Sequence, residues 1–258
     1  MRTVIMHFFN EEYMLPWWLT HHRTMFDHGI LIDYASTDRS VEISPDLAPG
    51  WQVVRSGNID FAALDADFEV MRYESGLPGW KIALNVTEFL CSSDLTELER
   101  RIESDDLDGW MVEGVTMVDP EPEAVPSRDI GLVRQKHVGF LERDNDFKDQ
   151  FNRHSRLYHR ARFGAYSPGR HHSHLPRIGH GDTNANVLWY VFSPWQPEFI
   201  QRKLQISGRI PERDRKAGFG FQHSYPQQHL EHLRQSLLPY AIDLAGLPSL
   251  RSTDGVEA

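Results

Sequence analysis

The sequence contains a single cysteine, Cys91, so an intrachain disulfide is excluded and a reducing, cytoplasmic environment is expected. Because it has no apolar run of about 18 residues, no segment is predicted to span a membrane, although peripheral association through exposed aromatic side chains stays open. Positive charge is also scarce. The formal net charge of −10 argues against a general binder of nucleic acid or anionic membranes. No secretory signal pattern precedes the first predicted strand.

What the sequence does contain is an alternation of short apolar runs and amphipathic stretches, which is typical of an α/β fold. Its 258 residues can bury a full core and fit one α/β domain with a carboxyl-terminal extension, or two small domains. We expect residues 1–135 to form a nucleotide-binding half. Residues 136–258 are expected to form an acceptor-side extension packed with it as one domain.

Polar residues follow two of the predicted strands where each strand ends. Residues 30–32 form a buried apolar run that stops at Asp33, and a turn ending in Asp38 leads to a helix near residue 39. The strand predicted over residues 3–9 is followed by Asn10 and Glu11. Ligands of open α/β sheets bind outside the carboxyl ends of strands, so these side chains predict one site. The competing interpretation is that Asp33 and Asp38 only shape a turn and cap a helix.

The order of these elements resembles the amino-terminal half of family 2-like glycosyltransferases, whose nucleotide-sugar-binding domain is of the GT-A type. The resemblance covers residues 3–118 and includes the aromatic helix at Trp17-Trp18. It implies that Asn10, Glu11 and Asp33, with Asp38 beside them, line the pocket for the nucleotide base and ribose.

The strand predicted from residue 80 departs from that family. Its equivalent there ends in an Asp-x-Asp motif, whose carboxylates hold Mg²⁺ or Mn²⁺ against the sugar-nucleotide diphosphate. Here the acids are replaced by Asn85 and Thr87, and only Glu88 keeps a charge. Three outcomes stay open: cations of the protein replace the metal, a metal binds through Glu88, Asn85 and a histidine, or transferase activity has been lost.

Helix patterns follow on either side of this strand. Apolar residues at helical spacing predict an inward face; they are Phe61, Leu64, Phe68 and Met71. Asp94 is expected to cap the helix after the strand, with Glu97 at the capping-box position. The next strand, residues 110–118, carries Glu113 and ends at Asp119, which are possible catalytic bases. Glu113 is alternatively an outward residue of an edge strand.

Histidines and arginines gather in residues 137–180, which hold seven of the fourteen histidines. His172 and His174 would point the same way on a strand and, with His180, are candidate metal ligands beside Glu88. A solvated basic loop is the alternative interpretation. Asp182 follows His180 in a tight loop and is a second candidate base.

The helix predicted from residue 197 to residue 206 carries Arg202 and Lys203, which could stabilise a diphosphate without metal or simply balance nearby acids. The predicted fold is thus α/β, a GT-A-like, mostly parallel central sheet flanked by helices. The resemblance implies a hexosyltransferase-type enzyme that moves a sugar from a nucleotide-sugar donor to a glycan or other small acceptor. The alternatives are a non-catalytic nucleotide-sugar or glycan-binding relative, and a histidine-dependent metal-binding protein.

Overall fold

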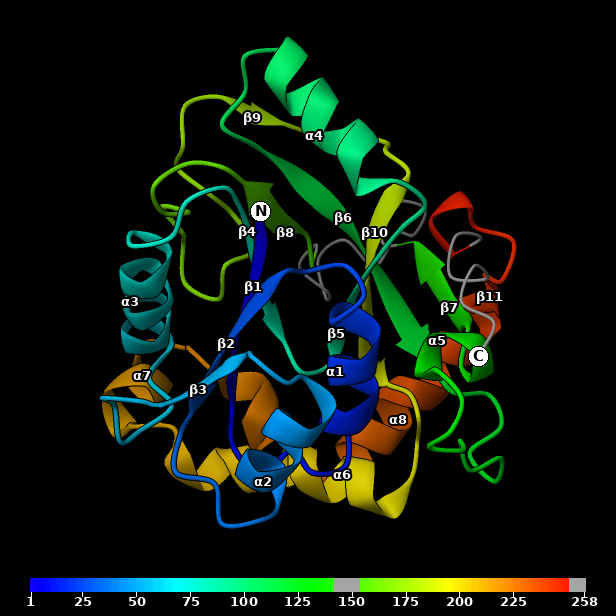
Figure 1. The fold of residues 1–258 in the computed structure, drawn as a ribbon. Helices are drawn as coiled ribbons and strands as arrows, with labels where there is room; N and C mark the ends of the chain where they lie inside the picture. Colours follow the sequence, from blue (N-terminus) through cyan, green and yellow to red (C-terminus); the bar gives the residue numbers. More distant parts are fainter. Residues whose placement is uncertain (142–153, 251–258) are drawn as a thin grey trace.

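The computed structural model describes residues 1–141 and 154–250. Strands and helices alternate through the first half of the chain (Figure 1). These elements are β1 (Arg2–Phe8), α1 (Leu15–His22), β2 (His28–Asp33), α2 (Ser40–Leu47), β3 (Gln52–Arg55), α3 (Ala63–Glu74) and β4 (Trp80–Asn85). The four strands lie parallel in the order β3-β2-β1-β4. The expected α/β architecture with a parallel sheet core is confirmed.

The rest of the chain adds strands to the same sheet. They are β5 (Glu88–Ser92), β6 (Gly109–Val118), β7 (Val138–Leu141), β8 (Arg156–His159), β9 (Ile178–Gly179), β10 (Ala185–Phe192) and β11 (Ile242–Asp243). β8 lies antiparallel between β4 and β6, so β6 runs in the same direction as β4. β10 pairs with β6 and β5, and β7 with β11 forms the other end of the sheet. Strands from residues 136–258 are therefore inserted into the sheet begun by residues 1–135.

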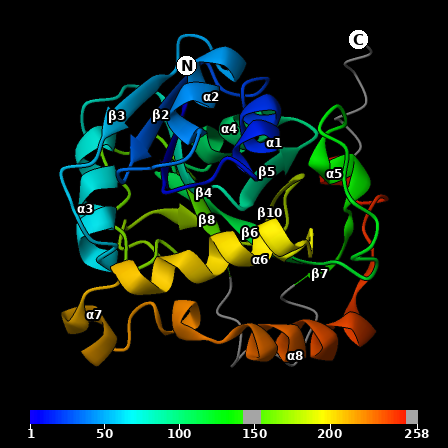
Figure 2. The ribbon, with the colours of Figure 1, turned by 90° about the horizontal axis from the view of Figure 1, so that it is seen from below.

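Helices cover the sheet and its carboxyl edge. They are α4 (Leu95–Ser104), α5 (Leu132–Gln135), α6 (Pro197–Leu204), α7 (Glu212–Lys216) and α8 (Gln227–Leu237), with 3-10 turns η3 (Gln205–Arg209), η4 (Phe221–Ser224) and η5 (Leu238–Tyr240). Figure 2 shows α6 crossing below the sheet and α8 running beyond it, with α7 at the left end of this layer. In the described residues no helix combines the length and apolar character that a membrane crossing requires.

Helix α4 begins as the sequence predicts. The side chain of Asp94 accepts hydrogen bonds from the backbone nitrogens of Thr96 and Glu97. The Glu97 carboxylate, however, pairs with Arg100 one turn later instead of closing a capping box. The buried face of α4 carries Leu95, as well as Leu98 and Ile102.

Helix α3 presents the opposite face to the one predicted. Leu64 and Phe68 are 44% and 63% exposed, whereas Asp67, Glu69 and Glu74 are buried. The physical reason is that each buried carboxylate has hydrogen-bond donors outside the helix: residues 164–170 supply them to Asp67 and Glu74, and residues 56–58 supply them to Glu69. Apolar packing on this face comes from smaller side chains such as Val70. Helical spacing of large apolar residues was therefore a misleading signal here.

This inversion predicts unequal stability effects on the same helix. Phe68→Ser is expected to change the free energy of unfolding by less than about 0.5 kcal/mol, because the ring is mostly in solvent. Val70→Ala should lower it by about 1–3 kcal/mol, because Val70 is 1% exposed and packs in the core. Urea titrations of both variants measure the difference. A larger loss from Phe68→Ser would contradict the observed orientation of α3.

Candidate functional site

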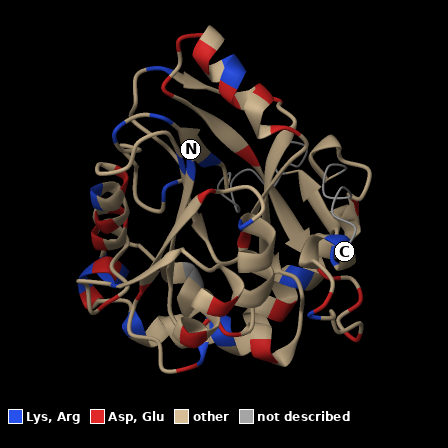
Figure 3. Cartoon of the chain, viewed as in Figure 1, with Lys and Arg blue, Asp and Glu red and all other residues tan. Residues whose placement is uncertain are grey.

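The carboxyl ends of β1, β2 and β4 meet at one edge of the sheet. Phe8 of β1 is in register with Asp33 of β2, and His7 is in register with Asn85 of β4. The residues after these strands therefore lie together. The strands themselves carry few charges, whereas this edge and the helices around it carry both signs (Figure 3).

Asn10 holds the loop that follows β2. Its backbone is left-handed, with φ of 50°. Its side-chain oxygen accepts hydrogen bonds from the backbone nitrogens of Thr37 at 2.7 Å and Asp38 at 3.3 Å. Its amide nitrogen donates to the Thr37 hydroxyl at 3.2 Å. The Asn10 side chain, which the sequence predicted to line the nucleotide pocket, thus links the loops that follow β1 and β2.

The acids of the same edge also have partners inside the chain. Both oxygens of buried Glu11 accept from Arg202, at 2.5 and 2.6 Å. Burial raises the pKa of the Glu11 carboxyl, and Arg202 opposes that shift. Asp38 accepts from the backbone nitrogens of Glu12 and Ser40, each at 3.0 Å. These hydrogen bonds hold the turn before α2, which is the structural interpretation that the sequence offered for Asp38.

Asp33 is less fully engaged. One of its oxygens accepts from the backbone nitrogen of Ser36 at 2.8 Å, and the other lies 3.7 Å from exposed Arg55. It sits at the end of β2 with 4% of its surface exposed. Among the described residues, the second oxygen of Asp33 thus has only a long contact, to the exposed side chain of Arg55.

At the end of β4, Glu88 is surrounded by donors. Arg156 of β8 donates to both of its oxygens, at 2.7 and 2.5 Å. Asn85 donates to the same oxygens from its backbone nitrogen at 2.8 Å and from its side-chain amide at 2.9 Å. Burial alone would raise the pKa of Glu88, but Arg156 and these hydrogen bonds hold it below its ordinary value. Glu88 is therefore an ionised partner of Arg156.

A second guanidinium, that of Arg170, lies against Asn85. It donates to the Asn85 side-chain oxygen at 2.8 Å and to Asp67 of α3 at 2.5 Å. Arg170 is 3% exposed, its backbone has φ of 62°, and its Nε has no hydrogen-bond partner in residues 1–141 and 154–250. A buried cation of the protein thus lies directly against Asn85 at the end of β4.

This arrangement explains why the residue is Asn85. The carboxamide accepts from Arg170 with its oxygen and donates to Glu88 with its nitrogen. An aspartate could accept from Arg170 but has no proton to donate when ionised, and would face the Glu88 carboxylate. The network therefore requires an amide, not an acid, at this position.

The metal ligands expected from the sequence are not brought together. Among the described residues no group of three or more His, Cys, Asp or Glu side chains is arranged to hold a metal ion. His180 follows β9, which pairs with the start of β6. Figure 1 places β9 beside α4, at the end of the molecule opposite α6 and α7. With Glu88 saturated and Arg170 beside Asn85, the residues at the end of β4 do not fit Mg²⁺ or Mn²⁺.

The histidine-rich segment has a different role from the one its sequence suggested. His172 and His174 close a loop: the backbone oxygen of His172 accepts from Ser167, and the His174 ring lies 3.0 Å from the Ser167 hydroxyl. Their neighbours point inward, Arg170 to Asn85 and His171 to Arg156 at 3.0 Å. The loop therefore places the Arg170 guanidinium beside Asn85 at the end of β4.

The two candidate bases also lie away from the strand ends. Asp182 lies in an exposed loop, and its backbone oxygen accepts a hydrogen bond from the side chain of Arg101 in α4. Glu113 lies in the middle of β6, in register with Asn186 of β10. Because β6 has strands on both sides, it is a central strand and not the edge strand that the sequence suggested.

The carboxyl-terminal cations Arg202 and Lys203 also contact other side chains of the protein. Arg202 is paired with Glu11, and the Lys203 ammonium lies 5.6 Å from the centre of the Phe192 ring. Burial, with a smaller contribution from Arg202, lowers the pKa of Lys203 to about 7. This lowered pKa weakens the case for Lys203 as the diphosphate cation.

Sequence reasoning missed Arg156, Arg170 and Asp67. Each is polar and was assigned to solvent or left unmentioned, because arginine and aspartate are mostly exposed in proteins. The available signal was the gathering of arginines among the histidines of residues 137–180. It did not indicate which arginines are buried.

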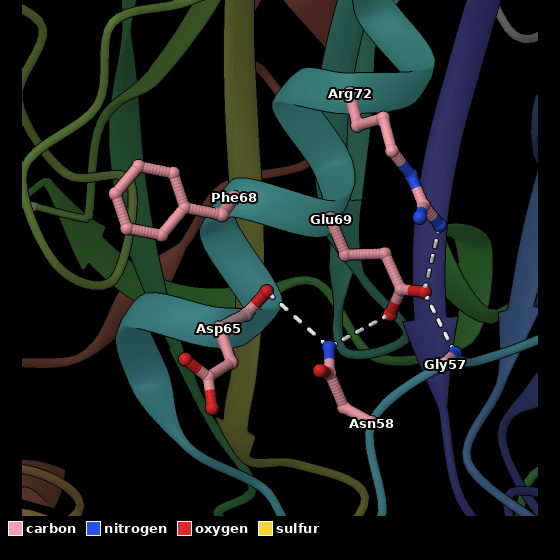
Figure 4. A pocket seen from close by; sticks show the side chains of 6 residues that line it. All are labelled: Gly57, Asn58, Asp65, Phe68, Glu69 and Arg72. Carbon is pink, nitrogen blue, oxygen red and sulfur yellow. Dashed lines mark hydrogen bonds and ion pairs between the residues drawn. The ribbon is translucent and has the colours of Figure 1, made fainter.

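A shallow hollow follows β3, next to the strand ends (Figure 4). Its volume is about 310 Å³, and a second hollow of about 500 Å³ shares part of its wall. The first is lined by Gly57, Asn58, Asp65, Phe68, Glu69 and Arg72. Buried Glu69 shapes it by accepting from Gly57 at 2.9 Å and from the Tyr34 hydroxyl at 3.3 Å. Tyr34 links this wall to the end of β2.

No protein-family model and no curated protein matches the chain. Among solved structures, TarS 1–349 of S. aureus in complex with UDP aligns over 92% of this chain and 70% of that one, with 13% identity and a TM-score of 0.45. A second TarS structure, of which this chain covers 42%, gives 12% identity and a TM-score of 0.44. Glucosyl-3-phosphoglycerate synthase from Mycobacterium tuberculosis aligns over 48% of this chain and 47% of that one, with 13% identity and a TM-score of 0.33. Such values do not decide an activity, so we infer the function from the site.

Proposed function

We propose that this protein is a glycosyltransferase that moves a sugar from a nucleotide-sugar donor to an acceptor without a divalent cation at the end of β4. The observation that carries the proposal is the Arg170 guanidinium bonded to Asn85 at that strand end. The gathering of Asn10, Glu11 and Asp33 at the neighbouring strand ends supports a nucleotide site.

Transfer breaks the bond between the anomeric carbon of the sugar and the diphosphate oxygen, and the electron pair leaves with the diphosphate. A bond forms from an acceptor hydroxyl oxygen to the anomeric carbon, and the hydroxyl proton passes to a base. Glu113 and Asp182 remain the proposed candidates for that base. Fixed cations stabilise the negative charge that develops on the leaving group, because they need no reorganisation during the reaction.

Arg170 is suited to this role by its unpaired Nε–H. Asp67 and Asn85 hold its two terminal nitrogens, so the guanidinium is fixed, while Nε keeps a donor without a partner among the described residues. A buried donor without a partner costs free energy. A phosphate oxygen that reached Nε would recover that cost. Arg156, bonded to Glu88, adds a second positive charge nearby.

A second candidate is a relative that binds nucleotide sugars but does not transfer them. The ion pairs of both guanidiniums favour it. Arg170 is 3% exposed and paired with Asp67, and Arg156 is 1% exposed and paired with Glu88. In this conformation the charges of the network cancel, and both guanidiniums are buried and already paired with carboxylates.

A thermal-shift screen with UDP-, GDP-, CMP- and dTDP-sugars tests the proposal. We expect one donor class to raise the melting temperature, since saturation at a hundred times Kd stabilises the folded state by about 2.7 kcal/mol. The shift should be the same with EDTA and with Mn²⁺. Release of free sugar from the donor that binds then separates the two candidates.

The outcomes are distinct. Donor binding with sugar release supports the transferase, and donor binding without release, for any acceptor tried, supports the binding relative. A donor-dependent shift that needs Mn²⁺ would contradict the cation-replacement proposal, and no shift with any donor would contradict both candidates.

A further inference from the structure

An aromatic site lies beside the ends of β1 and β2. Tyr34 and Phe61 stack with ring centres 4.5 Å apart and planes at 19°, and Phe9 lies 6.2 Å from Phe61. The planar guanidinium of Arg209 covers this site, 4.1 Å from the centre of the Phe9 ring and 5.2 Å from that of Phe61. A planar group with N–H donors, the Arg209 guanidinium, thus already lies against these rings.

Hydrogen-bond acceptors surround the Arg209 guanidinium. One terminal nitrogen donates to the backbone oxygen of Tyr34 at 2.5 Å, and the other donates to the backbone oxygen of Ile59 at 2.5 Å. The charges of Asp60 and Asp33 act on the same group. These two backbone oxygens therefore receive a pair of neighbouring N–H groups held in one plane.

The segment that carries Arg209 is fastened at other points. In residues 202–209, Arg202 pairs with Glu11, and the Gln205 amide donates to the backbone oxygen of Asn10 at 3.0 Å. Figure 2 shows α6, which leads into this segment, lying along the edge of the sheet. Withdrawal of the Arg209 side chain would open the aromatic site without breaking these anchors.

We propose that this site binds the base of the nucleotide donor, that the base is guanine, and that Arg209 holds its place until it binds. The inference rests on the proposed function and names its substrate class, a GDP-sugar. Guanine contains the same unit as a guanidinium: its ring N1–H and exocyclic N2–H₂ are attached to one carbon. Bases recognised by proteins stack on aromatic rings and bond through their Watson–Crick edges in this way.

The acceptors discriminate among bases. The Watson–Crick edge of uracil presents an N–H between two carbonyl oxygens, so an oxygen would face a backbone oxygen of Tyr34 or Ile59. A site built for a hydrogen-bond donor rejects a group that cannot donate, because the buried acceptor is left unpaired. Cytosine and adenine each offer a single exocyclic amine as donor, which can satisfy only one of the two oxygens.

Isothermal titration calorimetry with GDP, UDP, CDP and ADP tests the inference on the full-length protein. We expect GDP to bind at least about tenfold more tightly than UDP, the ratio given by one well-formed hydrogen bond. Arg209→Ala should tighten GDP binding about tenfold further, since the base no longer competes with the side chain. Arg209→Lys should act in the same direction, because an ammonium lacks the planar pair of donors.

Arg100→Ala is the matched control. Arg100 lies in α4, is 67% exposed and pairs with Glu97. Its removal should leave GDP affinity unchanged. A melting curve for each variant shows whether it is folded.

Each outcome of the titrations supports or contradicts a separate part of the inference. UDP or CDP binding more tightly than GDP overturns the assignment of the base, and weaker or unchanged GDP binding by both folded Arg209 variants overturns the competition. In these cases nucleotide binding is present and the proposed function stands. If neither the natural protein nor either variant binds any nucleotide, the proposed function fails as well.

Discussion

Replacing Arg156 with methionine is expected to lower the free energy of unfolding by about 3–5 kcal/mol, because Glu88 would remain as a buried carboxylate without its counter-ion. The side chains of Arg156 and Glu88 are 1% and 0% exposed. Solvent cannot compensate at such a position. The remaining donors to Glu88 come from Asn85 and carry no charge.

Two further proteins separate this effect from ordinary loss of an ion pair. Removing both charges with Arg156→Met and Glu88→Gln should recover much of the lost stability, since no unpaired charge is left. Arg100→Met, which breaks the exposed pair with Glu97, should cost less than about 1 kcal/mol. Chemical denaturation measures all three. A cost for Arg156→Met no larger than that for Arg100→Met would show that the pair is not desolvated in solution.

Acidification from pH 7 to pH 5.5 is expected to lower the free energy of unfolding by about 3–5 kcal/mol, well before the carboxylates titrate. Burial lowers the pKa of several histidines, with neighbouring cations adding to the shift in some. They are His7, His21, His22, His171 and His223, the last to about 3. The unfolded chain, with histidine pKa values of about 6.5, takes up protons below that pH that the folded protein does not. Stability contributed by these groups is therefore present above about pH 6.5 and is lost as the pH falls.

His22 shows why the folded state resists protonation. The backbone nitrogen of Leu90 donates to its Nε2 at 3.1 Å, and its Nδ1 lies 2.9 Å from the backbone oxygen of Trp18. Nε2 must accept a hydrogen bond, so a proton there would break the bond from Leu90 inside the core. His22 is 0% exposed, and it alone should contribute about 1 kcal/mol to the loss.

Unfolding curves from pH 7.5 to pH 5 measure this dependence. Glu88, whose pKa is lowered, loses its contribution only when the pH falls below about 4.5, so the two effects occupy separate ranges. Substituting exposed His28 with glutamine serves as the control and should leave the pH profile unchanged. A flat profile between pH 7 and pH 5.5 would mean that these histidines are accessible to protons in the folded state.

Local patterns in the sequence were sufficient for the sheet core and for the polar residues that follow its first two strands. Apolar runs followed by polar residues predicted β1 and β2 and the meeting of Asn10, Glu11 and Asp33 at their ends. Side-chain capping by Asp94 was predicted with equal success. Such features depend on residues close in sequence, where strand and helix periodicity and capping chemistry act.

Helix α3 marks the limit of periodicity as a guide. The spacing of Leu64 and Phe68 predicted a buried face, yet that face is exposed. The opposite face is buried because Glu74 accepts hydrogen bonds from Gly164 at 2.7 Å and from Tyr166 at 2.6 Å. A carboxylate can be buried when donors satisfy it. The donors, Gly164 and Tyr166, lie about ninety residues from Glu74 in the sequence, so no local pattern predicts them.

The sequence by itself determined that an α/β sheet ends in polar loops and that residues 85 and 87 are Asn and Thr, which carry no charge. Only the tertiary structure decided which charged groups surround Asn85. Arg170 lies 85 residues from Asn85, and Arg156 lies 68 residues from Glu88. Burial of a guanidinium is favourable only when a particular carboxylate and a particular carbonyl are already in place around it. Since those partners come from separate elements, the cation at the end of β4 is a property of the assembled fold and of no single stretch of the chain.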